Sequence, residues 1–595
     1  MKQRIVYLLA FYLLTVALFA VGKVAFMLLN QDAQTLTFDQ VGAVLRHGAS
    51  LDMSTALYFV IVPFLLGVLS LWLSIPRVLW KGYSLLVGVI ISLALVADAS
   101  LYSFWHFKLD ASCLQYLETP GEAVASVSAA YLLGRVALFL LLLSLTVYLF
   151  FRLIPRQLHP VRHPWPATLG GLALAPLLVI GIRGGLDEST TNVGQVYFSQ
   201  NQFLNHSAVN PVFSFFSSFE KTASHIVDYD YYDEEECARL TAGLYPTESV
   251  GSDSLLTMSR PDIVIILMES AGDHLSDVMP HLQRLKSEGV SFTNCYANTW
   301  RTDRGTVCAY SGYPSFPTSS VMKMPHKTQR LPSIARTLRN AGYETRYFYG
   351  GDINFTNMRG YLIDTGFEQL TWKRDFSAGQ QASSKWGVRD DIMFDAVFQS
   401  LTRPHDRPQL IGFSTLSSHE PWDVPLRQMD DTIRNAFCYL DNCIGRFVAR
   451  LRQTPQWDRT LLILLPDHSI DLGDITEAHP LRNHIPLVWT GGAVRKPREV
   501  TPYCNQTDLA ATLLAQLGLA HDDFRWSRDV LSSTYRYPFA VHNYNHGFSV
   551  VDSTGFLVYD LDSRRPLVID SSEPERLERM GKAILQATTE DLKEK

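Results

Sequence analysis

Residues 261–270 read PDIVIILMES. The letters DIVIILM form a strand-like run, and Glu269 and Ser270 follow it directly. More strand-like runs follow, YETRYFY at 343–349, QLIGFSTL at 409–416, TLLILL at 460–465 and PLVWTG at 486–491. Helix-like stretches lie between and after these runs, at 279–288, 334–341, 391–401, 432–453 and 506–517. Near-continuous apolar strands that alternate with amphipathic helices are typical of a mostly parallel sheet with both faces covered. We therefore predict an α/β domain.

Polar residues follow four of these runs at the point where each run ends. They are Glu269-Ser270, then Gly350, Gly351 and Asp352, then Ser417-Ser418-His419, and then Pro466-Asp467-His468. Because the active sites of open α/β sheets lie beyond the carboxyl ends of the strands, we expect these side chains to converge on one site.

The first third of the chain contains five apolar runs, at about 5–29, 57–75, 85–104, 132–151 and 167–182. Each is close to the roughly 20 residues that a helix needs to cross about 30 Å of hydrocarbon. The first run lacks a small-residue cleavage site and continues through residues 24–27, which favours an uncleaved span over a signal peptide. We predict five membrane spans.

The short loops between these runs predict the orientation. Loops on one side carry only basic residues, namely Lys2, Arg4, Arg77, Lys81, Arg152, Arg156 and Arg162. Loops on the other side carry the acids Asp32, Asp39, Asp52, Asp110, Glu118 and Glu122 against Arg46 and Lys108. Because Lys and Arg stay cytoplasmic, the N-terminus is predicted inside and everything after residue 185 outside.

These patterns divide the chain into three parts. Residues 1–185 form the predicted five-span transmembrane domain, 186–258 an acidic membrane-proximal linker with short helices, and 259–595 an extracytoplasmic catalytic domain. Within the last part, 538–595 form a small subregion with a β-hairpin, FSVVD and GFLVYDL around residues 553–555, and a charged terminal helix. The predicted location is the cytoplasmic (inner) membrane, as a multi-pass protein.

Composition excludes several classes of protein. The net charge is −6 and there is no Lys/Arg tract, which argues against a nucleic-acid partner. Seven cysteines are scattered without a CxxC pair, so zinc-ribbon and thioredoxin-like sites are not indicated. Their odd number leaves at least one thiol unpaired within the chain. Cys438 and Cys443 are poorly spaced for a disulfide on one helix, and we expect buried thiols.

Glu269, Asp467 and His468 offer two carboxylates and an imidazole, a ligand set that suits Zn²⁺ or Mn²⁺. Thr302 could supply a fourth ligand, and coordination would lower the pKa of its hydroxyl and make it a nucleophile. Arg304 could stand beside a phosphoryl group, and Gly305 would let a helix begin close to the anion. The alternatives are ordinary structural roles, with the strand-end acids as caps or loop residues and Thr302 as an N-cap.

One known family carries the same residues in the same order. Glu269, Arg301-Thr302, Ser418-His419, Asp467-His468 and the segment RNHIPL at 482–487 together resemble the lipoteichoic acid synthase family of the alkaline phosphatase and sulfatase superfamily. The five-span part is similar too, so the resemblance covers essentially the whole chain. It implies transfer of glycerol phosphate from the phospholipid phosphatidylglycerol to a glycolipid or glycan outside the cytoplasmic membrane. It also implies a phosphothreonine intermediate and one divalent ion, Mn²⁺ first, with Zn²⁺ or Mg²⁺ as alternatives.

The resemblance also implies residue roles. Glu269, Thr302, Asp467 and His468 match the metal site, and Thr302 is also the nucleophile. The predicted substrate-binding residues are His419, Arg359, Asp352, Asn357, Arg304 and His484. Asn357 stands where the family has a pocket tryptophan, and Leu472 where some members have a serine. The alternatives are an ion pair of Arg359 with an acid such as Asp364, a core position for His484, and helix capping by Asp303 and Arg304.

Other functions make different demands on the sequence. A sulfatase needs Cys or Ser at the nucleophile position, and this chain has Thr302. A two-metal phosphodiesterase needs a second cluster of Asp and His. A phosphoethanolamine transferase shares the threonine, metal and membrane anchor but typically carries several disulfides. A non-catalytic envelope protein need not keep all four residues of the metal site.

Overall fold

The computed structural model describes residues 1–31, 36–105, 108–111, 113–114, 129–156, 158–222, 226–470 and 479–595. The chain divides into two compact units, Met1–Ala223 and Ser224–Lys595, and each is described by itself. The predicted linker, 186–258, is shared between them. Asp32, Glu118 and Glu122 of the predicted outer loops, and Leu472, lie outside the described residues.

Among its described residues, the first unit contains five helices that are long and apolar enough to cross a membrane. They are α1 (Lys2–Asn30), α2 (Phe38–Leu69), α3 (Arg77–Trp105), α5 (Ala129–Leu153) and α6 (Pro164–Arg183). Three short helices of the predicted linker belong to the same unit, η2 (Val193–Val196), α7 (Gln202–Ala208) and α8 (Pro211–Thr222).

Helix α2 begins much earlier than the apolar run at 57–75. Thr37 and Gln40 form a capping box, in which each side chain accepts a hydrogen bond from the other residue's backbone N–H. The helix therefore includes Asp39 and Asp52, which were predicted in an outer loop. Asp52 is buried there in an ion pair with Lys23.

The second unit is built on an eight-stranded sheet with the strand order β5-β4-β6-β1-β7-β8-β2-β9. The strands are β1 (Asp262–Met268), β2 (Val290–Phe292), β4 (Glu344–Tyr349), β5 (Gln369–Trp372), β6 (Gln409–Ser414), β7 (Thr460–Pro466), β8 (Leu487–Thr490) and β9 (Arg498–Val500). Among these strands only β8 runs against its neighbours. The predicted mostly parallel sheet is confirmed.

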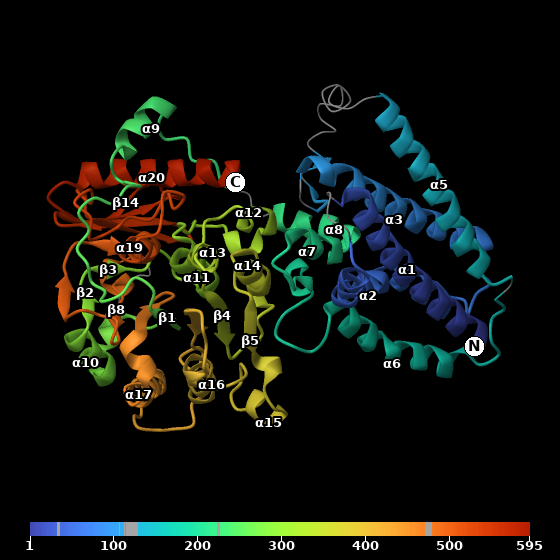
Figure 1. Cartoon of the computed structure of the whole chain (residues 1–595). Helices are drawn as coiled ribbons and strands as arrows, with labels where there is room; N and C mark the ends of the chain where they lie inside the picture. The colour runs from blue at the N-terminus through green and yellow to red at the C-terminus, as the bar shows by residue number, and fades with distance from the viewer. Residues whose placement is uncertain are drawn as a thin grey trace. The chain divides into compact units, whose positions relative to one another are not determined.

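Helices cover both faces of this sheet, which is why every residue of β1 is buried (Figure 1). Ile263, Ile265 and Leu267 face a core with α11 (Thr302–Ser311), α13 (Ile334–Asn340), α14 (Met358–Asp364) and α19 (Leu509–Gln516). Val264 and Ile266 face the opposite core with α10 (Pro280–Glu288), α16 (Asp390–Thr402) and α17 (Thr432–Leu451). Two covered faces explain why the strands read as unbroken apolar runs.

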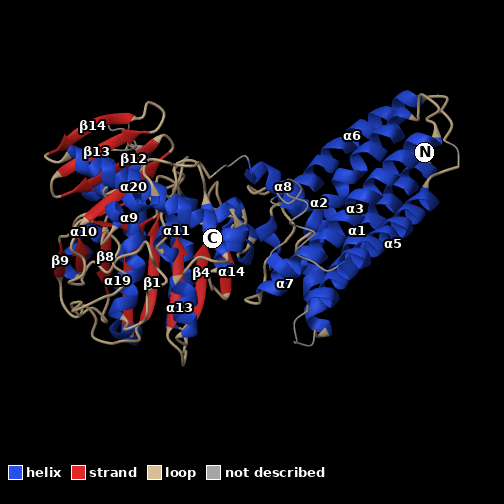
Figure 2. Ribbon diagram, turned by 90° about the horizontal axis from the view of Figure 1, so that it is seen from above, coloured by secondary structure: helices blue, strands red, loops and turns tan. Residues whose placement is uncertain are grey.

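A separate antiparallel sheet follows near the C-terminus (Figure 2). It consists of β11 (Phe539–Tyr544), β12 (Gly547–Asp552), β13 (Gly555–Asp560) and β14 (Arg565–Ser571). The predicted hairpin is β12–β13, and the structure adds a strand on each side of it. One face packs on the terminal helix α20 (Pro574–Glu594), and α9 (Glu234–Thr241) packs on α20 as well. The minor elements are β3 (Cys295–Tyr296), which pairs with β10 (Cys504–Asn505), α12 (Pro325–Thr328), α15 (Ala378–Gln381) and α18 (Pro480–Asn483).

Candidate active site

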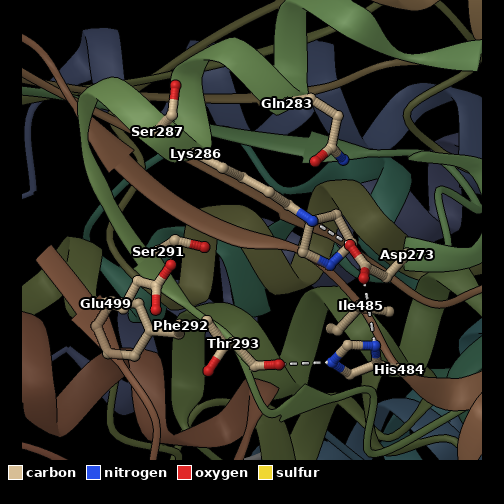
Figure 3. Close-up of a pocket in the computed structure, with 11 residues that line it drawn as sticks. Asp273, Gln283, Lys286, Ser287, Ser291, Phe292, Thr293, His484, Ile485 and Glu499 are labelled. Carbon is tan, nitrogen blue, oxygen red and sulfur yellow. Dashed lines mark hydrogen bonds and ion pairs between the residues drawn. The ribbon is translucent and has the colours of Figure 1, made fainter. Parts of the chain in front are cut away.

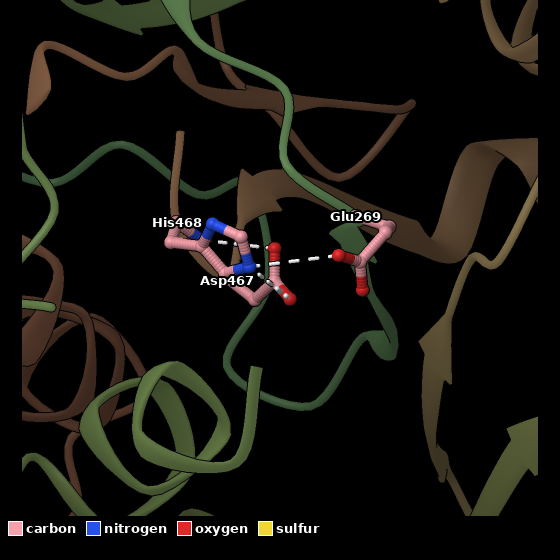
Figure 4. A group of neighbouring side chains, drawn as sticks. All are labelled: Glu269, Asp467 and His468. Atoms are coloured by element: carbon pink, nitrogen blue, oxygen red, sulfur yellow. Dashed lines mark hydrogen bonds and ion pairs between the residues drawn. The ribbon is translucent and has the colours of Figure 1, made fainter. Parts of the chain in front are cut away.

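The ends of β1 and β7 bring Glu269, Asp467 and His468 together. The two strands are adjacent and parallel, and Met268 is paired with Pro466, so Glu269 and Asp467 leave the sheet side by side. One ligand atom of each of the three residues lies within 4.8 Å of the others (Figure 4). This is the arrangement that strand-end reasoning predicts for an open α/β sheet.

Backbone and hydroxyl groups hold the three side chains in place. Asp467 Oδ1 accepts hydrogen bonds from the backbone N–H groups of Ser270 (2.9 Å) and His468 (2.8 Å). Glu269 Oε1 accepts a hydrogen bond from the Ser270 hydroxyl at 2.8 Å, and His468 Nε2 lies 3.5 Å from the same oxygen. The carboxylates are therefore oriented toward a common point.

One oxygen of this cluster has no hydrogen-bond partner among the described residues. Asp467 Oδ2 is fully buried, and His468 Nε2 lies 3.7 Å from it. A buried carboxylate oxygen without a donor costs free energy, and a cation removes that cost. Together with Glu269 and His468, it makes a hard and borderline donor set that fits one divalent metal ion such as Mn²⁺ or Zn²⁺.

Burial and the charges of the three neighbouring side chains also set their pKa values. Burial and the charge of Glu269 raise the pKa of Asp467 to about 7. Burial would also raise the pKa of Glu269, but the hydrogen bond and charge of His468 outweigh it and lower this pKa. Burial would lower the pKa of His468, but the two carboxylates outweigh it and raise this pKa. The cluster therefore stabilises positive charge, as a metal site must.

Helix α11 brings Thr302 to the cluster. Thr302 is the first residue of the helix and Arg301 occupies the N-cap position, so the structure does not use Thr302 as the N-cap. Instead, the Thr302 hydroxyl donates a hydrogen bond to Glu269 Oε2 at 3.2 Å. A Cβ atom on Gly305 would lie 2.7 Å from the Asp467 carbonyl carbon, so only glycine lets the helix approach this closely.

Three further residues position the cluster by contacting its backbone. The Ser418 hydroxyl donates to the Glu269 carbonyl at 2.7 Å, and the Glu269 N–H donates to the Thr415 hydroxyl at 2.9 Å. Gln506 Nε2 donates to the Asp467 carbonyl at 2.7 Å. Ser418 belongs to the predicted Ser418-His419 motif, but no pattern in the sequence assigns a site role to Gln506, the first residue of the 3₁₀ helix η8 (Gln506–Asp508) that leads into α19.

Residues 261–519 match the sulfatase family. The chain carries a sulfatase-family domain. The match includes Glu269, Thr302, Asp467 and His468, and the family belongs to the alkaline phosphatase superfamily that the sequence predicts. A solved protein of that superfamily from Vibrio parahaemolyticus is 25% identical and superimposes with a TM-score of 0.55. The similarity covers 62% of this chain and 98% of that one.

Two curated relatives extend the comparison beyond the fold. A "Phosphoglycerol transferase I" of Xanthomonas campestris is 25% identical over 284 residues, which cover 43% of this chain and 40% of the relative. "Lipoteichoic acid synthase 2" of Bacillus subtilis is 22% identical over 316 residues, which cover 46% of this chain and 48% of the relative. The match thus spans less than half the length of either relative. The predicted resemblance to the lipoteichoic acid synthase family is confirmed over the matched part of the chain, and its extension to the five-span part stays a prediction.

Within the sulfatase-family domain, His419 follows β6 at the same edge of the sheet. Burial acts to raise the pKa of Glu269, and His468 and then, more weakly, the charge of His419 act to lower it, so His419 lies within electrostatic range of the cluster. Trp386 packs against His419, with ring centroids 4.5 Å apart, and its indole N–H donates to the Glu420 carbonyl at 2.6 Å. The ring of Phe355 is 6.2 Å from Trp386. Sequence reasoning missed Trp386, because the loop SSKWG at 383–387 carries no recognisable signal.

Asp352, Arg359 and Asn357 lie in the segment after β4. Asp352 Oδ1 is buried and accepts from the backbone N–H and side-chain amide of Asn354, at 3.1 and 3.0 Å. Burial and the charge of Arg374 lower the pKa of Arg359, while Asp375 and Asp352 oppose the change. Asn357 is in the left-handed region, with φ of 67°, and donates to the Met322 carbonyl at 2.8 Å.

Arg304 and His484 form their hydrogen bonds with residues that do not belong to the three-residue cluster. Arg304 Nη1 donates to the Pro317 carbonyl at 3.2 Å, and its guanidinium stacks 5.4 Å from the centre of the Trp300 ring. His484 shares a hydrogen bond of 2.8 Å between Nε2 and the Thr293 carbonyl and lines a cavity beside α10 and β2 (Figure 3). Substrate binding by these two residues stays a prediction.

Proposed function

We propose that this protein transfers a phospho-alcohol head group to an acceptor of the cell envelope through a phosphothreonine intermediate on Thr302. The donor is phosphatidylglycerol, the transferred group is glycerol phosphate, and the acceptor is a glycolipid or glycan. One divalent ion, Mn²⁺, is the cofactor. The observation that carries this proposal is the Thr302 hydroxyl at 3.2 Å from Glu269 Oε2, within a cluster of metal-capable side chains.

The two relatives support this choice of head group. One is named a phosphoglycerol transferase, which names the proposed head group, and the other is named a lipoteichoic acid synthase, the family that the sequence resembles. A sulfatase activity is disfavoured although the domain is of the sulfatase family, because threonine cannot be converted to the formylglycine that sulfatases use. All seven cysteines are free, which disfavours the disulfide-rich phosphoethanolamine transferases.

Glu269, Asp467, His468 and the Thr302 hydroxyl would hold the metal ion, which when bound neutralises charge on the phosphoryl oxygens and favours the ionised threonine. Thr302 Oγ1 attacks the phosphorus, and its proton has an acceptor within reach in Glu269 Oε2. The bond from phosphorus to the diacylglycerol oxygen breaks, and that oxygen takes up a proton. In the second step an acceptor hydroxyl attacks the phosphorus and Thr302 is released.

His419 and Arg359 serve the head group in this proposal. The His419 imidazole lies beside the cluster and can donate a proton to the leaving oxygen. The Arg359 guanidinium offers a planar pair of hydrogen-bond donors to the phosphate. The Asp352 carboxylate offers acceptors to the glycerol hydroxyls. The five apolar helices would hold the chain in the cytoplasmic membrane, with residues 224–595 on the outer face.

Intact-mass measurement of the detergent-solubilised full chain tests this function. After incubation with phosphatidylglycerol, we expect an added mass that maps to Thr302, and release of diacylglycerol. Thr302→Ala should abolish both while keeping the bound metal, and Thr302→Ser should retain a fraction of the rate. The matched control is Thr306→Val, because the Thr306 hydroxyl is one helical turn away and donates only to the Thr302 carbonyl, at 2.8 Å.

Two results would contradict the proposal. An adduct that persists in Thr302→Ala would mean that another residue is the nucleophile. An adduct formed from phosphatidylethanolamine in preference to phosphatidylglycerol would keep the mechanism but change the donor.

A further inference from the structure

Two cysteines that are 209 residues apart in the sequence, Cys295 and Cys504, lie directly opposite each other in the fold. Strands β3 and β10 are parallel, and these two residues are partners in their register. The Cys504 N–H donates to the Asn294 carbonyl at 2.9 Å. One residue further along, Asn505 Nδ2 donates to the Tyr296 carbonyl at 3.1 Å. Hydrogen bonds on both sides of the pair therefore fix the register.

The two side chains also face each other. Register partners in neighbouring strands project their side chains to the same face of a sheet. Both cysteines are completely buried, and they belong to the same apolar core. Burial, and then the hydrogen bond and charge of the Cys504 thiol, raise the pKa of Cys295 well above its usual value. The two sulfur atoms are thus neighbours within the core.

The separation of the two backbones suits a covalent bond between the sulfurs. Neighbouring strands lie about 4.8 Å apart. A disulfide joins Cα atoms that are roughly 4.4–6.8 Å apart. The pairing of β3 with β10 therefore already holds the two Cα atoms at a distance that a disulfide spans.

Other buried thiols of the same domain have partners of a different kind. The Cys308 thiol donates to Asn298 Oδ1 at 3.7 Å. Cys443 Sγ accepts from Arg446 Nη2 at 3.4 Å. These contacts are ordinary for buried cysteines, which behave as small apolar residues with a weak S–H donor. The direct pairing of one thiol with another sets Cys295 and Cys504 apart.

The predicted location of the domain supplies the chemical environment. Residues 224–595 lie outside the cytoplasm in the proposed function, and disulfides form and persist in that oxidising space. Both residues are thiols in the structure. Two thiols in contact would not stay reduced in such a compartment while the chain folds.

We infer that Cys295 and Cys504 form a disulfide bond in the exported protein. The oxidant is a disulfide-bearing thiol oxidase of the envelope. One cysteine thiolate attacks a sulfur of the oxidase disulfide and releases one of its thiols, and the second cysteine attacks the mixed disulfide and releases the other. The chain thereby loses two electrons and two protons, and the oxidase is reduced to a dithiol. Because both sulfurs are buried in the folded domain, the exchange takes place before folding is complete.

The bond would link two segments that build the candidate active site. Cys295 is seven residues before Thr302, and Cys504 is two residues before Gln506, which donates to the Asp467 carbonyl. A cross-link between residues so far apart in the sequence restricts the unfolded chain and so stabilises the folded one. A single bond is fewer than the several that phosphoethanolamine transferases carry, so that function stays disfavoured.

Counting of thiols on the full chain, isolated from membranes in detergent without reductant, tests this inference. The chain is unfolded in N-ethylmaleimide and its mass is measured. We expect five of the seven cysteines to be alkylated, because two are bonded, and all seven after reduction. A proteolytic map without reduction should contain one cross-linked pair of peptides, which carry Cys295 and Cys504. In Cys295→Ser the released partner should react, so that all six remaining cysteines are alkylated without reduction.

Thermal unfolding gives a second measurement. A reductant present during heating should lower the melting temperature of the wild type by about 5 °C, because the unfolded chain then loses its cross-link. Cys295→Ser and Cys504→Ser should show no such effect of the reductant. The matched control is Cys443→Ser, a buried thiol on the opposite face of the sheet, which should respond to the reductant as the wild type does.

The outcomes separate this inference from the proposed function. Seven alkylated cysteines in the unreduced wild type overturn the disulfide, and so does a cross-link between any other two cysteines. An effect of the reductant that persists in Cys295→Ser overturns it as well. The count on the wild type needs no variant, so it decides even where a variant fails to fold. A protein with seven free thiols that forms the Thr302 adduct refutes only the disulfide. A protein with the disulfide that never forms the adduct refutes only the proposed function.

Discussion

Gly305→Ala changes the distance between the predicted nucleophile and the metal-capable cluster without removing any polar group. The new methyl carbon would lie 2.7 Å from the Asp467 carbonyl carbon and 3.0 Å from its Cα. Carbon atoms pack at about 3.5–4.0 Å, so helix α11 must retreat by roughly 1 Å. Thr302 Oγ1 starts 3.2 Å from Glu269 Oε2, and such a retreat carries it beyond hydrogen-bonding range.

A displacement of about 1 Å in a reacting group costs on the order of 10²-fold in rate. We therefore expect Gly305→Ala to slow diacylglycerol release from phosphatidylglycerol by about 10²-fold, while overpacking costs about 1–3 kcal/mol of stability. Release is measured with labelled lipid and stability by thermal unfolding. The control is Gly379→Ala in α15, where an added Cβ meets nothing within 4 Å. A Gly305→Ala protein that folds and keeps a rate within about twofold of wild type would refute the geometric reasoning.

The remaining predictions concern the metal site, the pocket and the topology. Asp467→Asn should lose the metal ion, yet stabilise the metal-free protein more at pH 8 than at pH 5. The reason is that Asp467 has a folded-state pKa raised from 3.8 to about 7, so its contribution to stability is lost as the pH rises through 7. Thermal unfolding in chelator measures this, and an advantage that is independent of pH would contradict it. Trp386→Ala should raise the KM for the lipid donor at least about tenfold with unchanged metal content, because it removes the ring that packs on His419, and Trp386→Phe should restore most of the affinity. Equal KM values for the lipid donor in the wild type and both Trp386 variants would mean that Trp386 does not help to bind the donor. A reporter enzyme fused after residue 260 should be active only outside the cytoplasm. Reporter activity in the cytoplasm would contradict the predicted five-span topology.

Much of the candidate site could be predicted from the residues that follow the apolar strands in the sequence. A strand buried on both faces must be apolar along its whole length, so β1 and β7 stand out as runs, and the first polar residue after each is visible by contrast. Parallel neighbours bring those residues to the same edge of the sheet, which is why the sequence alone predicts that Glu269, Asp467 and His468 lie together. Residue order alone also placed Thr302 near them, through the family resemblance.

Other features could not be predicted from the sequence, because they depend on which segments become neighbours in the folded chain. β11 and β14 were missed since one carries His542 and Asn543 amid its apolar residues and the other is an exposed edge strand. Trp386 comes from a polar loop, and its contact with His419 follows from the position of that loop beside β6.

The sequence by itself determined the apolar membrane helices, the alternation of strands and helices, and the chemistry available at each strand end. Those properties are local, because periodicity and composition record how each segment is buried. Only the tertiary structure decided the approach of Gly305 to Asp467, the unsatisfied oxygen Asp467 Oδ2, and the pairing of Cys295 with Cys504. Each of these depends on strand order and helix packing between residues distant in the chain, and a linear pattern does not encode such distances.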